Sequence, residues 1–176
     1  MNIAIIGNGK MGKLISKIAT ERNHIITIKT SSNNPAYNVN FKNIDVAIDF
    51  STPDTAFENI SHAIKNNIPV ISGTTGWTNK LDEIKNLCKH HNGAFLHSPN
   101  FSIGVNLFFK LNIELAKLMK KQNYKIQIHE VHHTDKIDSP SGTAKRIKTD
   151  INKVIHYPEK ISSERIENII GTHKVT

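Results

Sequence analysis

The side chains of this chain that could do chemistry are concentrated between residues 130 and 144, in the stretch EVHHTDKIDSPSGTA. Two adjacent histidines, His132 and His133, and Lys136 lie among three acidic residues, and a Pro-Ser-Gly-Thr turn follows. Histidine titrates near neutral pH and can donate a proton, and a lysine can pair with a carboxylate. This stretch is therefore the first candidate for a catalytic site.

Three interpretations of the stretch compete, and the first is a metal site. Adjacent strand residues point to opposite faces, which keeps His132 and His133 from sharing one ion. C-x-x-C spacing is absent as well, so no metal is expected. The second interpretation is a solvated loop, which explains single charges but not a histidine pair followed by P-S-G-T at a helix start.

The third interpretation is a substrate clamp at the beginning of a helix. Backbone N–H groups and hydroxyls at that helix N-terminus would bind one carboxylate of an anion, and they belong to Ser141, Gly142 and Thr143. Lys136 and one histidine would pair with a second carboxylate, and the other histidine would donate a proton. This arrangement suits a dicarboxylate held opposite a nicotinamide.

The first residues of the chain have the pattern of a dinucleotide-binding element. NIAII (2–6) predicts a strand, and G-x-G-x-x-G follows at Gly7, Gly9 and Gly12, before a helix expected over 13–22. Gly7 permits a tight turn, Gly9 lets the backbone approach a pyrophosphate, and Gly12 allows close helix–strand packing. The helix N-terminus would offer free N–H groups to the phosphates.

Strand and helix patterns alternate beyond this element. Helices are expected from Pro53 and over 79–91, and further strands at 24–30, 45–50, 69–72 and 94–98. Alternation of this kind predicts an α/β fold with a doubly wound parallel sheet of the Rossmann type. Ligands of such sheets bind beyond the carboxyl ends of the strands, where GNGKMG, DFSTP, GTTGW and HSPNF lie in this sequence.

The pattern changes near residue 102, which divides the chain into a dinucleotide-binding domain (1–102) and a smaller α+β domain (103–176) for substrate binding and oligomerisation. Ser102 can cap a helix that runs to about 120, and one apolar face of that helix carries Leu107, Leu111, Leu115 and Leu118. A half-exposed strand over 124–133 and a helix over 143–154 follow, with a partial second strand after them.

Composition excludes several classes of protein. The hydrophobic share of 38% and charged share of 22% are typical of a soluble globular chain, and no apolar run approaches the ~20 residues of a bilayer span. The N-terminus does not resemble a signal peptide and Cys88 is the lone cysteine, so a cytoplasmic location is expected. The net charge of +8 comes mostly from scattered lysines, with three arginines among 23 basic residues, so no nucleic-acid partner is expected.

The motifs GNGKMG, DFSTP, GTTGW, SPNFSIGVN and EVHHTDKIDSPSGTA, in this order, resemble those of the 4-hydroxy-tetrahydrodipicolinate reductase (dihydrodipicolinate reductase) family of diaminopimelate and lysine biosynthesis. The resemblance extends over the whole chain, and E-x-H-H-x-x-K-x-D-x-P-S-G-T-A is the family's own signature. It implies hydride transfer from NADPH or NADH to a ring carbon of an unsaturated cyclic imine dicarboxylate, after water is lost from the hydroxylated substrate.

The resemblance also implies roles for individual residues. His132 matches the proton donor, Lys136 the catalytic and substrate-binding lysine, and His133 a second histidine that contacts substrate. Gly142 and Thr143 match the carboxylate-binding pair, beside Ser141. The residues expected to bind the cofactor lie in the dinucleotide loop and in the loops that line the nicotinamide: Gly7, Asn8, Gly9, Lys10, Met11, Gly12, Gly73, Thr74, Thr75, Ser98, Pro99, Asn100 and Phe101.

Two features depart from the expected pattern. Folds that prefer NAD place an acid after the second strand, whereas this chain has Lys29, Thr30, Ser31 and Ser32 there and no acid until Asp45. NADPH is therefore expected to serve at least as well as NADH. Family members also continue for several tens of residues past GTHKVT and form a homotetramer, so this chain is expected to be a fragment, the product of a frameshifted gene or a shortened protein, without the tetramer.

Two other functions remain open from the sequence. One is a non-catalytic dinucleotide-binding remnant of such a reductase, which the intact 130–144 stretch disfavours. The other is a dehydrogenase that acts on another small acid, which would make the same stretch a coincidence.

Overall fold

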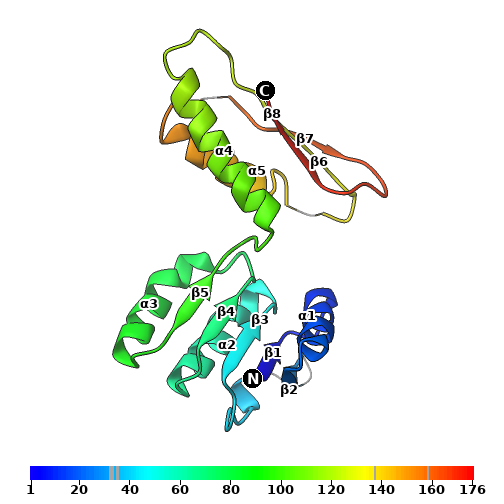
Figure 1. Cartoon of the computed structure of the whole chain (residues 1–176), viewed down its shortest axis with the longest axis vertical. Helices are drawn as coiled ribbons and strands as arrows, with labels where there is room; N and C mark the ends of the chain where they lie inside the picture. Colours follow the sequence, from blue (N-terminus) through cyan, green and yellow to red (C-terminus); the bar gives the residue numbers. More distant parts are fainter. Residues whose placement is uncertain (32–33, 35, 137, 158) are drawn as a thin grey trace. The chain divides into compact units, whose positions relative to one another are not determined.

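The computed structural model describes residues 1–31, 34, 36–136, 138–157 and 159–176, which form two compact units (Figure 1). Unit 1 is Met1–Pro99 and unit 2 is Asn100–Thr176, so the division falls three residues before the boundary expected after residue 102. Each unit has its own sheet and its own buried apolar cluster.

Unit 1 is a parallel five-stranded sheet with the order β2-β1-β3-β4-β5 (Figure 1). Its strands are β1 (Asn2–Ile6), β2 (Ile25–Thr30), β3 (Val46–Asp49), β4 (Val70–Ser72) and β5 (Phe95–His97). Its helices are α1 (Lys10–Glu21), α2 (Pro53–Lys65) and α3 (Leu81–His90), with 3-10 turns η1 (Ala36–Asn38) and η2 (Thr78–Lys80).

Both faces of this sheet are covered, as the sequence predicted. Successive residues of a strand point to opposite faces, and β1 follows this rule. Ile3 and Ile5 lie in the cluster that contains Ala19 of α1, whereas Ala4 and Ile6 lie in the cluster that contains residues of α2 and α3. The doubly wound α/β fold is therefore confirmed, and its strand order reverses between β1 and β3.

Helix α1 begins earlier than the sequence predicted. It starts at Lys10, directly after Gly9, so that Lys10, Met11 and Gly12 belong to its first turn instead of a loop. The physical reason is the absence of a side chain at residue 12. A Cβ on Gly12 would lie 1.9 Å from the carbonyl oxygen of Gly7, so only glycine lets the helix begin this close to the end of β1.

Unit 2 contains helices on a three-stranded mixed sheet with the order β7-β6-β8. Its elements are α4 (Ile103–Met119), β6 (Ile128–His132), α5 (Gly142–Asn152), β7 (Ser162–Arg165) and β8 (Thr172–Val175). The central strand β6 pairs in parallel with β7 and antiparallel with β8. Its core joins Phe109 of α4, Ile128 of β6 and Ile147 and Ile151 of α5.

Three features of unit 2 differ from the expectation. The strand expected over 124–133 is limited to Ile128–His132, and two strands follow α5 where one partial strand was expected. Ser102 does cap α4, since its hydroxyl accepts the N–H of Val105 at 3.3 Å. The leucine face of α4 does not enter the core of this chain: Leu107 and Leu118 are 59% and 75% exposed, and the helix buries the face that carries Phe109 instead.

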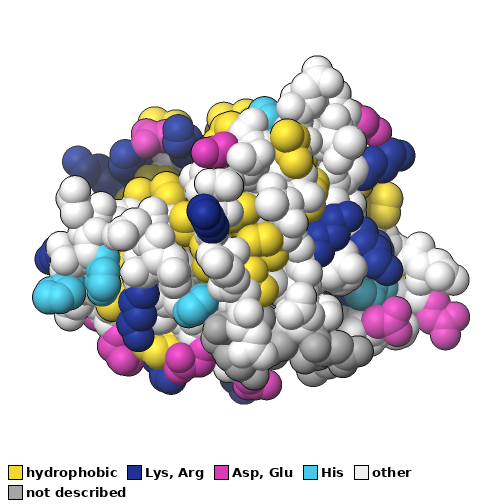
Figure 2. Space-filling view, turned by 90° about the horizontal axis from the view of Figure 1, so that it is seen from below, with side chains coloured by type: hydrophobic (Ala, Val, Ile, Leu, Met, Phe, Trp, Pro, Cys, Tyr) yellow, Lys and Arg dark blue, Asp and Glu magenta, His cyan; other side chains and the backbone are white. Residues whose placement is uncertain are grey.

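Basic side chains are scattered over the surface drawn in Figure 2, in several separate places among acidic and apolar groups. This arrangement agrees with the distribution of lysines along the sequence. Among the described residues, no helix is both long enough and apolar enough to span a bilayer.

Candidate active site

A cleft of about 500 Å³ lies at the carboxyl ends of β1, β2 and β3 in unit 1. The lining residues come from the glycine loop, the end of β2, η1, the loop after β3 and helix α2: Gly7, Asn8, Gly9, Thr30, Ser31, Ala36, Phe50, Ser51, Thr52, Thr55 and Asn59. This is the edge at which ligands of doubly wound sheets bind, beside the point where the strand order reverses.

The geometry of the glycine loop fits a dinucleotide. Gly7 has a φ of +95°, and a Cβ there would lie 2.3 Å from the carbonyl oxygen of Phe50, so the turn requires glycine. Gly9 has no neighbour within 4 Å of the position of a Cβ, which leaves the backbone open at the start of α1. The free N–H groups and positive dipole end of α1 there suit a pyrophosphate.

Thr74 has a structural role that the sequence did not predict. Its hydroxyl donates to Oδ2 of Asp49 at 2.8 Å and accepts the N–H of Ser51 at 2.9 Å, and the side chain is buried. Asp49 is 0% exposed, and burial raises the pKa of its carboxyl although Ser51, Ser72 and Thr74 donate to it. Thr74 therefore holds the loops after β3 and β4 together, and its neighbour Thr75 is the exposed one.

Gly73 follows β4 and lies against the ring of Phe50. The cofactor residues expected over 98–101 lie in the connection between the units. Ser98 follows β5, and its N–H donates to the carbonyl of Ser72 at 3.1 Å. Asn100 accepts the N–H of Ser102 with its side chain at 2.8 Å and so helps to begin α4. Phe101 is 45% exposed.

The segment after β2 carries no acidic group toward the cleft. Thr30 is buried, and its hydroxyl accepts the N–H of Gly7 at 3.3 Å, whereas Ser31 lines the cleft. Asp45 lies before β3, at the opposite end of the strands, where it accepts the N–H of Asn2. No cleft-lining residue among those described is acidic. Ser32, also considered from the sequence, lies outside the described residues.

In unit 2 the candidate site is built around a buried carboxylate, Glu130 of β6, which is 0% exposed. Its oxygens accept the N–H of Ser141 at 3.0 Å and the hydroxyl of Ser163 at 2.9 Å. The guanidinium of Arg165 lies 3.6 Å away. A buried carboxylate needs such donors, since an unpaired charge is costly away from water.

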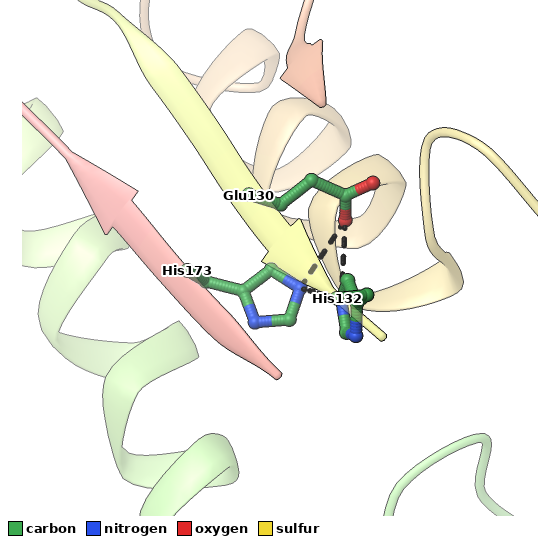
Figure 3. Close-up of side chains that lie close together, drawn as sticks. All are labelled: Glu130, His132 and His173. Atoms are coloured by element: carbon green, nitrogen blue, oxygen red, sulfur yellow. Dashed lines mark hydrogen bonds and ion pairs between the residues drawn. The ribbon is translucent and has the colours of Figure 1, made fainter. Parts of the chain in front are cut away.

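Two histidines, His132 and His173, face this carboxylate (Figure 3). Nε2 of His132 lies 3.5 Å and Nε2 of His173 3.4 Å from Oε2 of Glu130, and the two Nε2 atoms are 3.3 Å apart. The two histidine side chains are only 12% and 14% exposed. Strand β8 pairs antiparallel with β6, and this pairing places His173 opposite Glu130.

The titration of this cluster follows from burial and charge. Burial lowers the pKa of His132, as do the charges of Lys136 and Arg165, against the opposing effect of Glu130. Burial and the charge of His132 lower the pKa of His173. Burial alone would raise the pKa of Glu130, but hydrogen bonds from Ser141 and Ser163 and the charge of His132 hold it below its usual range.

The loop after β6 carries Lys136, whose ammonium group pairs with Asp138 at 2.5 Å. Arg165 of β7 fastens this loop, since its Nε donates to the carbonyl of Lys136 at 3.2 Å and its Nη2 to that of Asp138 at 2.6 Å. His133 is about half exposed, and its Nδ1 lies 3.9 Å from Oδ2 of Asp135.

At the start of α5, the three residues of the expected clamp divide into two groups. Ser141 is buried: its N–H donates to Glu130, and its hydroxyl accepts the N–H of Ala144 and contacts Nε2 of His173 at 3.0 Å. Ser141 therefore serves the carboxylate and the helix cap. Gly142 is exposed and its N–H donates to Oδ2 of Asp138 at 3.3 Å, and Thr143 is half-buried.

The sequence did not identify Arg165 and His173 as members of the site. Both lie in the C-terminal strands, 27 and 41 residues from the groups they contact, Asp138 and His132. One clue was available, because Arg165 is one of three arginines in a chain whose other basic residues are lysines.

Unit 1 has a glycine loop beside the point where the strand order of a doubly wound sheet reverses. Unit 2 is smaller and has a histidine–carboxylate cluster. Together they define a two-domain protein of the dinucleotide-binding class. Family models make the class specific. The model for the N-terminus of dihydrodipicolinate reductase matches residues 1–101, and the model for its C-terminus matches residues 104–176. The chain belongs to the dihydrodipicolinate reductase family.

Individual relatives agree with this assignment. The chain is 41% identical over its whole length to 79% of a 4-hydroxy-tetrahydrodipicolinate reductase from Christiangramia forsetii. It is 35% identical, over 97% of its length, to 72% of one from Lawsonia intracellularis. A dipicolinate-bound dihydrodipicolinate reductase from Paenisporosarcina sp. TG-14 has the same fold: the TM-score is 0.71 with 24% identity, over 99% of this chain and 82% of that one.

Proposed function

We propose that this chain reduces 4-hydroxy-tetrahydrodipicolinate to tetrahydrodipicolinate with a reduced nicotinamide cofactor, in the diaminopimelate and lysine pathway. Its family and the names of its relatives support this activity. The observation that carries the proposal is in unit 2. A buried histidine–carboxylate cluster there lies beside a lysine and the N-terminus of α5, which together suit proton transfer to a dicarboxylate.

The cofactor belongs in the cleft of unit 1. Gly7 and Gly9 bring the backbone to the pyrophosphate, and the start of α1 supplies N–H groups to it. When bound, the reduced nicotinamide supplies a hydride. The part of the cleft lining that the structure describes has no acidic residue to repel a 2′-phosphate, so NADPH serves at least as well as NADH. Calorimetric titration tests this: NADH binding more than tenfold tighter than NADPH would contradict it.

The substrate belongs in unit 2. Gly142 and Thr143 bind one carboxylate at the N-terminus of α5, and Lys136 binds the other. Both Gly142 and Lys136 exchange their partner Asp138 for the ligand. His133, which is exposed and precedes Lys136 by three residues, adds a further contact to the substrate. His132 donates the proton that balances the hydride, since in its charged form it carries a proton on each ring nitrogen.

The activity is tested by following NADPH oxidation with freshly formed substrate. His132→Gln should lower kcat by ~10²–10⁴ and leave cofactor affinity nearly unchanged. The matched control is His129→Gln, on the other face of β6, where the ring contacts Ser162. Wild-type turnover in His132→Gln, or equal loss in the control, would reject the proton-donor role.

The dicarboxylate clamp has its own test. Pyridine-2,6-dicarboxylate should compete with substrate, and Lys136→Ala should raise both its inhibition constant and the KM. Lys174→Ala, on the exposed side of β8, is the control for a change of charge alone. The clamp is wrong if the inhibitor fails to bind the cofactor-loaded protein and Lys136→Ala leaves KM unaltered.

A further inference from the structure

Three atoms that can bind a metal ion lie together in unit 2 (Figure 3). They are Oε2 of Glu130 and the Nε2 atoms of His132 and His173, and the distances between them are 3.3, 3.4 and 3.5 Å. Tetrahedral Zn²⁺ binds nitrogen and oxygen ligands at about 2.0–2.1 Å, which places neighbouring ligand atoms about 3.3–3.4 Å apart. The three atoms therefore have the spacing of one face of a zinc tetrahedron.

The two imidazole rings have the separation that a shared ion requires. Rings that bind one ion at about 2.0–2.1 Å, with their Nε2 atoms at the observed spacing, have centroids about 5.1–5.2 Å apart. Rings that point directly at each other across the same spacing would have centroids about 5.6 Å apart. The observed distance between the centroids of His132 and His173 is 5.0 Å, and the ring planes are inclined by 70°. This value is close to the shared-ion arrangement.

The carboxylate of Glu130 is held mainly through its other oxygen. Oε1 accepts the hydroxyl of Ser163 at 2.9 Å and lies 3.6 Å from the guanidinium of Arg165. The N–H of Ser141 is shared between Oε1 at 3.0 Å and Oε2 at 3.2 Å. Because a carboxylate oxygen has two lone pairs, Oε2 keeps one for an ion. Hydrogen bonds of this kind orient a metal ligand and are part of a metal site.

Binding of an ion needs one change in the hydrogen bonds of Ser141. Its hydroxyl lies 3.0 Å from Nε2 of His173 and also hydrogen-bonds Glu130. When the ion takes the lone pair of His173, the hydroxyl hydrogen donates to Glu130 instead. A histidine binds metal as a neutral imidazole, and burial lowers the pKa of both His132 and His173, which favours that form.

The ligand types and the local charge select the kind of metal. Two imidazole nitrogens and one carboxylate oxygen suit Zn²⁺, Co²⁺ and Ni²⁺, whereas Ca²⁺ and Mg²⁺ prefer sets of oxygens. The charged groups that act on His132 are two acids, Glu130 and Asp138, and two bases, Lys136 and Arg165. Their charges balance, so the affinity for the ion comes from coordination bonds and not from an excess of negative charge.

The sequence argued against a metal because the adjacent His132 and His133 point to opposite faces of a strand. The structure brings the second histidine from a different strand, β8, which pairs antiparallel with β6. We propose that Glu130, His132 and His173 form a binding site for a divalent transition-metal ion of the Zn²⁺ type, with water as the fourth ligand.

The site has a consequence for catalysis that rests on the proposed function. An imidazole with a metal on Nε2 and a hydrogen on Nδ1 has no lone pair left for another proton. His132 cannot then become charged, so the bound ion prevents it from donating the proton that balances the hydride. The metal is therefore an inhibitor of the proposed reductase and not its cofactor.

Titration with Co²⁺ tests the site without activity. The full chain, freed of metal with a chelator, should bind one Co²⁺ with the strong visible absorption of a tetrahedral ion, and Zn²⁺ should displace it. His173→Gln should weaken binding by more than about 100-fold, beyond the ~10–100-fold that loss of an outer partner costs. His129→Gln is the matched control and should bind as wild type, since His129 lies on the other face of β6 beside Ser162.

Nitrogen-15 spectra of the wild-type chain identify the ligands even if His173→Gln does not fold. Zn²⁺ should shift Nε2 of His132 and His173 and leave unchanged His90 and His91, an adjacent pair in unit 1 with ring centroids 5.3 Å apart. Zn²⁺ shifts confined to His90 and His91 would overturn the proposal. So would the weak absorption of octahedral Co²⁺ alone, or equal Co²⁺ affinity in folded His173→Gln.

Turnover tests the inhibition. One equivalent of Zn²⁺ should suppress NADPH oxidation by wild type and by His129→Gln alike, and a chelator should restore it. Undiminished turnover while Zn²⁺ is bound to His132 would reject the inhibition. If no form of the chain oxidises NADPH, the proposed function fails, while the Co²⁺ titration and the nitrogen-15 spectra still decide whether the metal site exists.

Discussion

Replacing Glu130 by Gln should weaken unit 2 by about 3 kcal/mol. Gln keeps the size of the side chain and one acceptor for the N–H of Ser141, but it leaves the guanidinium of Arg165 without its counter-charge 3.6 Å away. Removing one partner of a buried charge pair costs about 3–5 kcal/mol. The lower end applies here because the Arg165 side chain is 21% exposed and also donates to the carbonyls of Lys136 and Asp138.

The effect should depend on pH in a defined direction. Burial opposes ionisation of Glu130, but hydrogen bonds and the charge of His132 outweigh it, so the folded pKa lies below the unfolded value of about 4.3. A carboxyl with a depressed pKa contributes stability above its unfolded pKa and loses it as the pH falls through the folded pKa. The difference between wild type and Glu130→Gln should therefore be complete at pH 7 and shrink below about pH 4.

Urea unfolding with separate reporters for the two units is the appropriate assay. Fluorescence of Trp77, the single tryptophan, reports unit 1, and hydrogen exchange of the β6 amides reports unit 2. The control is Glu164→Gln on β7, whose side chain is 58% exposed and should change stability by less than about 0.5 kcal/mol. Equal destabilisation by Glu164→Gln would refute the reasoning. So would a stability difference between wild type and Glu130→Gln that persists unchanged at pH 3.

Two further predictions concern unit 1. Gly12→Ala should lower the free energy of unfolding reported by Trp77 by about 2 kcal/mol or more, because its Cβ meets the carbonyl of Gly7. Gly9→Ala, with open space around it, should leave that free energy unchanged and weaken only NADPH binding. Thr74→Val should lower the free energy of unfolding by about 1–3 kcal/mol, because it leaves buried polar groups without a hydrogen-bond partner. Thr75→Val, at an exposed position, should change it by less than about 0.5 kcal/mol. Equal effects within either pair would contradict the roles assigned to Gly12 and Thr74.

The parts of the fold that sequence reasoning predicted depend on local patterns. The strand–glycine–helix element at 2–22, the cap at Ser102 and the helix after Ser141 each depend on residues a few positions apart. The start of α1 was predicted three residues late, because the contact that fixes it joins Gly12 to the carbonyl of Gly7 and is visible only in three dimensions.

The parts that it missed depend on strand register. Nothing in the sequence near His173 indicates that this side chain will face His132, because that contact requires β8 to pair antiparallel with β6 and Glu130 to face residue 173. The structural role of Thr74 was missed for a related reason. Its hydroxyl is used by Asp49, 25 residues earlier, and only pairing of β3 with β4 brings the two together.

The order of the two units along the chain has a consequence for synthesis on the ribosome. Every residue of unit 1 precedes every residue of unit 2, and its strands are joined through short βα segments. Domains generally fold as units from the N-terminus during translation. The nucleotide cleft can therefore form on a nascent chain that still lacks β8. Because ligand binding stabilises a folded state by mass action, a bound nicotinamide cofactor would stabilise unit 1 before His132 and His173 have met.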